Sequence, residues 1–214
     1  VRLFLGDIIY SLDGRWVKLV VIACNTLTVL GVDTLKGSHA FEIVGMSKGA
    51  QLVLAASSRK KIGVFATEFT INSGAHKAAI LAADDGADVY PQACPKFVPL
   101  IEGEQFDSAE VRAAVAEYAA PLKVAGIDTL ILSCTHYPFI QKEIESEFGS
   151  EVTVIDPADA TAQDTKTVLA AEGLLRSEGA GTLEVCFTAD VERGARIAGR
   201  VLPQGKCLFK EIKL

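Results

Sequence analysis

The sequence predicts an α/β fold with parallel sheets, arranged as two similar units. Short runs rich in Val, Ile and Leu alternate with helical patterns along the 214 residues, and such runs are typical of strands buried in parallel sheets. Two of the runs, LVVIACNT (19–26) and TLILSCTH (129–136), also resemble each other. This likeness indicates an internal repeat.

Seven apolar runs are short enough to be strands and are bounded by polar or turn residues. We expect strands at 18–23, 41–45, 61–66, 88–92, 128–133, 152–156 and 183–187. Helical patterns lie between several of them, at 73–84, 108–125 and 138–148, and a fourth follows the last strand, at 190–201.

Capping and turn residues set the limits of these helices. Asp107 and Glu110 stand at the spacing of a capping box, with Asp107 as the expected N-cap. Pro121 is expected to kink or shorten the same helix. Gly149 marks the end of the third helix, and Asp190 is a suitable N-cap for the fourth.

The repeat has a constant shift of 110 residues. At this shift Cys24 falls on Cys134, the run 19–22 falls on 129–132, and the run 42–44 falls on 152–154. Each cysteine then lies at the C-terminal tip of a strand, where open α/β sheets bind ligands. The alternative is a coincidence between two strands rich in Val and Ile.

The repeat also shows a deficit at the start of the first unit. Strand 61–66 leads to Thr67, which lies 67 residues before Cys134, whereas only 23 residues precede Cys24. By symmetry we expect about 43 residues of the first unit to be missing from the printed sequence.

Composition excludes several classes of protein. The net charge of −6 argues against non-specific nucleic-acid binding. There is no run of 18 uncharged apolar residues, and Asp7 comes too early for the core of a signal peptide. The five cysteines are widely spaced without a CxxC pair, so we expect reduced thiols in a cytoplasmic protein, no membrane association and no metal site.

The two repeated cysteines suggest proton transfer. Residues i and i+2 of an extended segment share a face, so Cys134 and His136 point the same way, as do Cys24 and Thr26. A following helix N-terminus lowers the pKa of a nearby thiol and can hold a carboxylate. One such cysteine beside a histidine would suggest a nucleophile. Two facing thiols would instead invert a carbon acid without a cofactor, one removing a proton and the other delivering one. The alternative is that both are buried core residues.

Several segments together resemble the glutamate racemases of the aspartate/glutamate racemase superfamily. They are VIACNT (21–26), IGVFATEFT (62–70), CPKFVPLIE (94–102), SCTHYP (133–138) and VIDPADATA (154–162). The resemblance implies two pseudo-symmetric flavodoxin-like domains with the active site in the cleft between them. We place the first domain at 1–58 plus 178–214 and the second at 59–177. The resemblance also implies glutamate as substrate, no cofactor, a role in supplying D-glutamate for peptidoglycan, and a possible homodimer.

The resemblance assigns roles to individual residues. Cys24 and Cys134 match the two catalytic acid/base residues, and Glu102 matches a carboxylate that supports the catalytic His136. The positions that match substrate contacts are Asn25, Thr26, Thr67, Thr70, Thr135 and His136.

The sequence departs from the family pattern in two ways. The Asp-Ser-Gly and Pro-Tyr-Gly motifs of the family are not present, and residues 7–10 resemble the family segment between them. Phe69 stands where the family usually has Gly, and its ring would either crowd the loop or point outward.

Two other functions are compatible with these residues. One is a related two-cysteine racemase that acts on aspartate or a hydantoin. The other is a catalytically weak homologue that acts as a binding protein, for example as an inhibitor of DNA gyrase.

Overall fold

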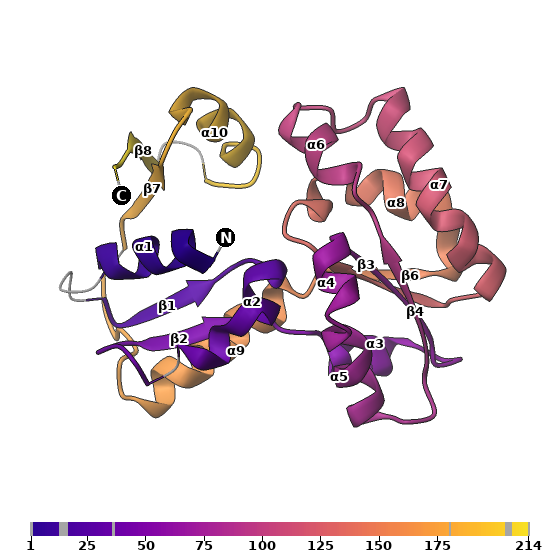
Figure 1. Ribbon diagram of the computed structural model, residues 1–214, viewed down its shortest axis with the longest axis horizontal. Helices are drawn as coiled ribbons and strands as arrows, with labels where there is room; N and C mark the ends of the chain where they lie inside the picture. Colours follow the sequence, from indigo (N-terminus) through magenta and orange to yellow (C-terminus); the bar gives the residue numbers. More distant parts are fainter. Residues whose placement is uncertain (1, 13–16, 36, 180, 204–206, 214) are drawn as a thin grey trace.

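Figure 1 shows the computed structural model, which describes residues 2–12, 17–35, 37–179, 181–203 and 207–213. Two α/β units lie side by side, with a small C-terminal subdomain above the first unit and facing the second. All strand pairs are parallel. The α/β class expected from the alternation of apolar runs and helices is therefore confirmed.

The second unit is built on a four-stranded sheet in the order β4-β3-β5-β6. Its strands are β3 (Lys61–Ala66), β4 (Asp88–Ala93), β5 (Thr129–Ser133) and β6 (Thr153–Ile155). All five residues of β5 are buried, as expected for a continuous apolar run in the middle of a parallel sheet. This strand ends directly before Cys134.

Helices cover both faces of this sheet. One face carries α3 (Ala50–Ala56), α4 (Glu68–Asn72) and α5 (Ala75–Ala83), and the other carries α6 (Phe97–Glu102), α7 (Ala109–Ala125), η2 (Tyr137–Ile140), α8 (Gln141–Phe148) and η3 (Gly149–Glu151). Neighbouring residues of a strand point to opposite faces. Accordingly Leu130 and Leu132 join the core under α7 and α8, while Ile131 joins the core under α3 and α5.

The ends of α7 differ from the sequence-based expectation. The N-cap is Ser108, whose hydroxyl accepts the backbone N–H of Val111, and not Asp107. Pro121 also does not shorten the helix, because α7 continues through it to Ala125. Leu122 and the buried side chains before it hold this helix on the sheet, and packing of this kind outweighs one lost backbone hydrogen bond.

The first unit is smaller. It contains α1 (Arg2–Leu12), β1 (Leu19–Ile22), α2 (Asn25–Gly31), η1 (Val32–Thr34) and β2 (Glu42–Gly45), and β1 pairs with β2. Its core includes Ile9 of α1, Ile22 of β1 and Ile43 of β2, which are all nearly inaccessible to solvent.

The internal repeat is visible in the structure. At the 110-residue shift β1 falls on β5, and α1 falls within α7. The partner strand needs a shift of 111, since Leu19 pairs with Glu42 whereas Thr129 pairs with Thr153. In the described part of the chain the first unit has no counterpart of β3 or β4. Residues 7–10 lie in α1, at the place that α7 holds before β5.

The chain crosses between the units near Gly49 and Pro157. After the first crossing, α3 packs against β5 of the second sheet. After the second, α9 (Ala158–Ala171) lies against β2, and its Thr161 hydroxyl accepts the backbone N–H of Ser47 at 3.0 Å. We therefore propose unit boundaries near 49 and 157. Boundaries at 58 and 177 would assign α3 to the first unit and α9 to the second, whereas α3 packs on the second unit and α9 packs on the first.

The C-terminal subdomain consists of β7 (Leu183–Phe187), α10 (Val191–Ala198) and β8 (Cys207–Glu211). β7 pairs with β8 in a two-stranded parallel sheet. The Asp190 carboxylate accepts the backbone N–H of Arg193, which confirms the expected N-cap of α10. Figure 1 shows α10 facing α6 of the second unit.

Candidate active site

Cys24 lies where β1 turns into α2. Its backbone is extended (φ −150°, ψ 118°), and it occupies the N-cap position with its carbonyl accepting the N–H of Thr28. The thiol residue is half-buried, and the next residue, Asn25, is only 3% exposed. The sequence places Cys24 here because an apolar strand of four residues ends two positions before it, at Ile22, and the helix begins directly after it, at Asn25.

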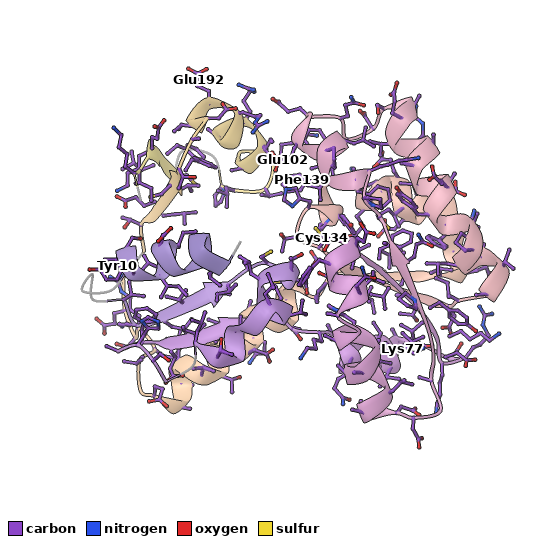
Figure 2. The ribbon with its side chains drawn as sticks, in the orientation of Figure 1. Tyr10, Lys77, Glu102, Cys134, Phe139 and Glu192 are labelled. Atoms are coloured by element: carbon purple, nitrogen blue, oxygen red, sulfur yellow. The ribbon has the colours of Figure 1, made fainter. Side chains whose placement is uncertain are left out.

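Cys134 occupies the equivalent place at the end of β5 and is 8% exposed. Burial raises the pKa of its thiol to about 11, and the nearby Cys24 contributes in the same direction. The backbone N–H groups of His136 and Tyr137 act against this rise. Cys134 therefore holds its proton at neutral pH, and the two thiols are near enough for the charge on one to affect the other. Figure 2 shows Cys134 on the side of the second unit that faces the first.

Three threonine hydroxyls join the two units beside these cysteines. Thr26 of the first unit lies 2.9 Å from the Thr67 hydroxyl and 3.2 Å from the Thr70 hydroxyl. Thr67 also donates to Thr70 at 3.0 Å and caps α4 by accepting the N–H of Thr70. Residues 26, 67 and 70, which the family resemblance assigns to substrate contacts, thus form one hydrogen-bonded cluster.

Phe69 does not disturb this cluster. Its side chain is 48% exposed, so the ring points outward. Thr67 and Thr70 lie before and after Phe69 in the sequence, and their hydroxyls are hydrogen-bonded to each other.

His136 is paired with Glu102. The Nε2 atom of His136 lies 2.7 Å from Oε1 of Glu102, which is the last residue of α6. A carboxylate on one ring nitrogen fixes the orientation and the tautomer of an imidazole. The other oxygen of Glu102 lies 3.9 Å from Nη2 of Arg193 in α10.

The structure brings most of the residues selected from the sequence to the facing sides of the two units, with one exception. Thr135 is exposed, and no described contact joins it to the other candidates. Arg193 was missed by sequence reasoning, because it lies 91 residues from Glu102 in the chain. Only the packing of α10 against the second unit reveals it.

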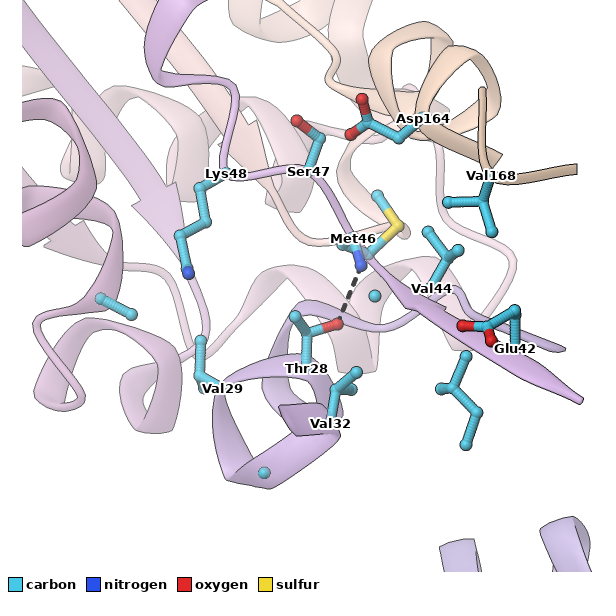
Figure 3. A pocket seen from close by; sticks show the side chains of 14 residues that line it. Thr28, Val29, Val32, Glu42, Val44, Met46, Ser47, Lys48, Asp164 and Val168 are labelled. Carbon is cyan, nitrogen blue, oxygen red and sulfur yellow. Dashed lines mark hydrogen bonds between the residues drawn. The ribbon is translucent and has the colours of Figure 1, made fainter. Parts of the chain in front are cut away.

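A separate pocket of about 620 Å³ lies between β2, α2 and α9 (Figure 3). Thr28 accepts the backbone N–H of Met46 at its floor, and Lys48 and Asp164 also line it. Neither Cys24 nor Cys134 lines this pocket. The pocket is therefore separate from the site that the two thiols define.

The described residues contain no group of three or more His, Cys, Asp or Glu side chains arranged to hold a metal ion. They also include no helix that is both long and apolar enough to cross a membrane.

The sequence of this chain is similar to a known protein family and to curated relatives. The model of the Asp/Glu/Hydantoin racemase family matches residues 4–165. The chain belongs to this family. Among its curated relatives, a glutamate racemase of Lysinibacillus sphaericus (strain C3-41) is 36% identical over 216 aligned positions, which span all of this chain and 82% of the relative. A glutamate racemase of Lactiplantibacillus plantarum is 41% identical over 170 positions, 79% of this chain and 62% of the relative.

Solved racemase structures share the fold. Glutamate racemase isoform RacE1 from Bacillus anthracis superposes with a TM-score of 0.90 at 30% identity, over 99% of this chain and 79% of that one. Glutamate racemase from Thermus thermophilus, solved in complex with beta-chloro-D-alanine, superposes with a TM-score of 0.80 at 31% identity, over 100% of this chain and 79% of that one. These racemases confirm the fold class of two α/β units.

Proposed function

We propose that this racemase interconverts L- and D-glutamate by proton transfer between the substrate Cα and two thiols, Cys24 and Cys134. The observation that carries the proposal is their equivalence. They lie at the same position of two repeated units, each at a strand tip and before a helical turn, and Cys24 is near enough to contribute to the raised pKa of Cys134. The names of the relatives support glutamate as the substrate.

In one direction a thiolate at Cys24 takes the Cα proton and the electron pair of the C–H bond stays on Cα. The thiol of Cys134 then delivers its proton to the opposite face of Cα, which inverts the configuration. The pKa of about 11 suits Cys134 to this role, because the thiol is protonated at neutral pH. After the transfer Cys24 holds a proton and Cys134 is the thiolate, so the enzyme is ready for the reverse reaction. The scheme balances without a cofactor.

The remaining candidates bind and orient. The amide nitrogen of Asn25 is buried, and no described group accepts a hydrogen bond from it. A buried donor without a partner is costly, so we assign it to a substrate oxygen. The hydroxyls of Thr26, Thr67 and Thr70 supply further polar contacts, and Glu102 orients His136 beside Cys134. Thr135 is assigned to substrate binding on its place in the motif.

Chiral chromatography of incubations with L- and D-glutamate tests this function, with aspartate and a hydantoin as competing substrates. We expect turnover of glutamate in both directions, and loss of turnover in Cys24→Ala and Cys134→Ala. Cys186→Ala is the matched control, because Cys186 is exposed on β7. Faster turnover of aspartate or a hydantoin would reassign the substrate, and no turnover at all would favour a binding protein.

We also propose that the D-glutamate formed supplies peptidoglycan synthesis. A homodimer stays a prediction.

A further inference from the structure

The C-terminal helix α10 and the turn that follows it contact the second unit through three basic side chains, Arg193 and Arg196 of α10 and Arg200 of the turn. Nη2 of Arg196 lies 2.6 Å from Oε1 of Glu104, and Nε lies 3.2 Å from Oε2, so this pair is bidentate. The guanidinium of Arg200 lies 3.9 Å from the ring centroid of Phe106. Arg193, one turn before Arg196, approaches Glu102. Residues three or four apart share a helix face, so Arg193 and Arg196 reach the segment 102–106 from one side of α10. Arg200, two residues past the end of the helix, reaches the same segment.

The Arg193 contact differs from the other two because Glu102 also holds His136. One carboxylate oxygen binds the His136 ring at 2.7 Å, and the other faces Arg193 at 3.9 Å. A line of charged and polar groups therefore runs from α10 through Glu102 to the histidine two residues after Cys134. Figure 2 shows Glu102 and Phe139 on the side of the second unit that faces α10, whereas Glu192 points away from it.

The guanidinium of Arg193 is itself held in place. Its Nε atom lies 3.1 Å from the Asp190 carboxylate, three residues earlier and at the N-cap of the same helix. The N-cap therefore fixes the direction in which Arg193 reaches Glu102. Next to Arg193, a pocket of about 380 Å³ separates α10 from η2, and Phe139, Phe187 and Ile197 line it. Since this space leaves α10 without close apolar packing here, the charged contacts determine how the helix sits on the second unit.

We propose that Arg193 is a positioning residue, which holds the free oxygen of Glu102 so that the carboxylate keeps His136 oriented beside Cys134. The inference rests on the proposed function for its effect on turnover. Its structural part, the link from α10 to the His136 ring, can be measured without turnover.

The chain offers a matched control for this role. Arg193→Gln and Arg196→Gln each remove one positive charge from the same face of α10. Arg196 makes the shorter and bidentate ion pair, but it contacts Glu104 and not Glu102. If the arginines only dock the helix, Arg196→Gln should have at least as large an effect as Arg193→Gln. If Arg193 acts through Glu102, only Arg193→Gln should affect the histidine.

Steady-state kinetics with glutamate gives the first readout. Both side chains are about half exposed, and the free energy of such a contact corresponds to a rate change of about two- to five-fold. We expect Arg193→Gln to lower kcat by this factor with little change in KM, Arg196→Gln to leave both constants close to wild type, and Arg193→Lys to recover more than half of the loss. An equal loss in both Gln variants, or no loss in Arg193→Gln, would overturn the proposal.

Nitrogen-15 NMR of the imidazole rings gives the second readout. The chain has three histidines, so one His136→Asn variant assigns the signal of His136. We expect the His136 ring signals to move in Arg193→Gln and to stay in place in Arg196→Gln. Unmoved signals in Arg193→Gln would overturn the inference even in an active enzyme. Moved signals in a protein that does not racemise glutamate would support the link and refute the proposed function.

Discussion

The hydroxyl of Thr26 provides the sharpest test of how the two units meet. Thr26→Val keeps the shape of the side chain but removes the hydroxyl that contacts Thr67 at 2.9 Å and Thr70 at 3.2 Å. Thr70 is 1% exposed but keeps its hydrogen bond to Thr67, so no buried hydroxyl is left without a partner. The loss is then that of two neutral hydrogen bonds.

Each such bond contributes about 0.5–1.5 kcal/mol, so we expect Thr26→Val to lower the free energy of unfolding by about 2 kcal/mol. In a chain of this size, that corresponds to a decrease in Tm of roughly 4–8 °C. We also expect a lower kcat/KM for glutamate, because the threonines contribute to the proposed substrate site. Calorimetry and steady-state kinetics measure the two effects.

A double-mutant cycle isolates the contact between the units. Thr67→Val also removes the N-cap of α4, but this cost is present with and without Thr26 and cancels in the cycle. We expect a coupling between Thr26→Val and Thr67→Val of about 0.5–1.5 kcal/mol. The control pair is Thr28→Val with Thr67→Val, because the Thr28 hydroxyl bonds within the first unit, to Met46. A coupling near zero for Thr26, or one equal to that of Thr28, would refute the proposed contact.

Three further predictions concern individual groups. A pKa of about 11 leaves roughly one Cys134 thiol in a thousand ionised at pH 8, compared with about one in four for a free cysteine. The rate of iodoacetamide labelling of Cys134, followed peptide by peptide, should therefore rise about ten-fold from pH 8 to pH 9. A labelling rate that does not change with pH would contradict the raised pKa. Burial raises the pKa of Asp128, but hydrogen bonds from the Ser57 hydroxyl and the Arg59 backbone outweigh burial and hold the pKa below its usual value. Its contribution to stability is therefore fully present above about pH 4 and decreases as the pH falls further. Asp128→Asn should cost about 1–3 kcal/mol in urea unfolding at pH 7 and less at pH 3; an equal cost at both pH values would contradict this. Gly49→Ala should destabilise by about 1–3 kcal/mol, because φ is +62° and a Cβ would lie 2.4 Å from Ile131; Gly74→Ala, with φ of +67° and open space around it, should cost less.

The strands of the second unit were predictable because each is a short apolar run. The expected strands 61–66 and 128–133 agree closely with β3 and β5. β8 was not predicted, since Cys207–Glu211 has only three apolar residues and is stabilised by pairing with β7. The apolar pattern did not indicate α9 either, because polar residues fill much of Ala158–Ala171 and its position depends on contact with β2.

The candidate site was predictable where its residues lie close together in a motif. Cys24 with Thr26, and Cys134 with His136, follow directly from two strand tips of similar sequence. The pairing of Glu102 with His136 was expected from the family resemblance and is present in the structure. The approach of Arg193 to Glu102 could not be expected, because it depends on how α10 lies against the second unit, and local sequence does not determine that arrangement.

The two-thiol mechanism is tested most directly by the exchange of the Cα hydrogen for deuterium in D₂O by the single variants Cys24→Ala and Cys134→Ala. Each variant keeps one thiol on one face of the substrate. We predict that neither variant racemises glutamate, and that each incorporates deuterium into one enantiomer only, with opposite preferences. Racemisation by a variant that lacks both thiols, or incorporation into the same enantiomer by both single variants, would contradict the account.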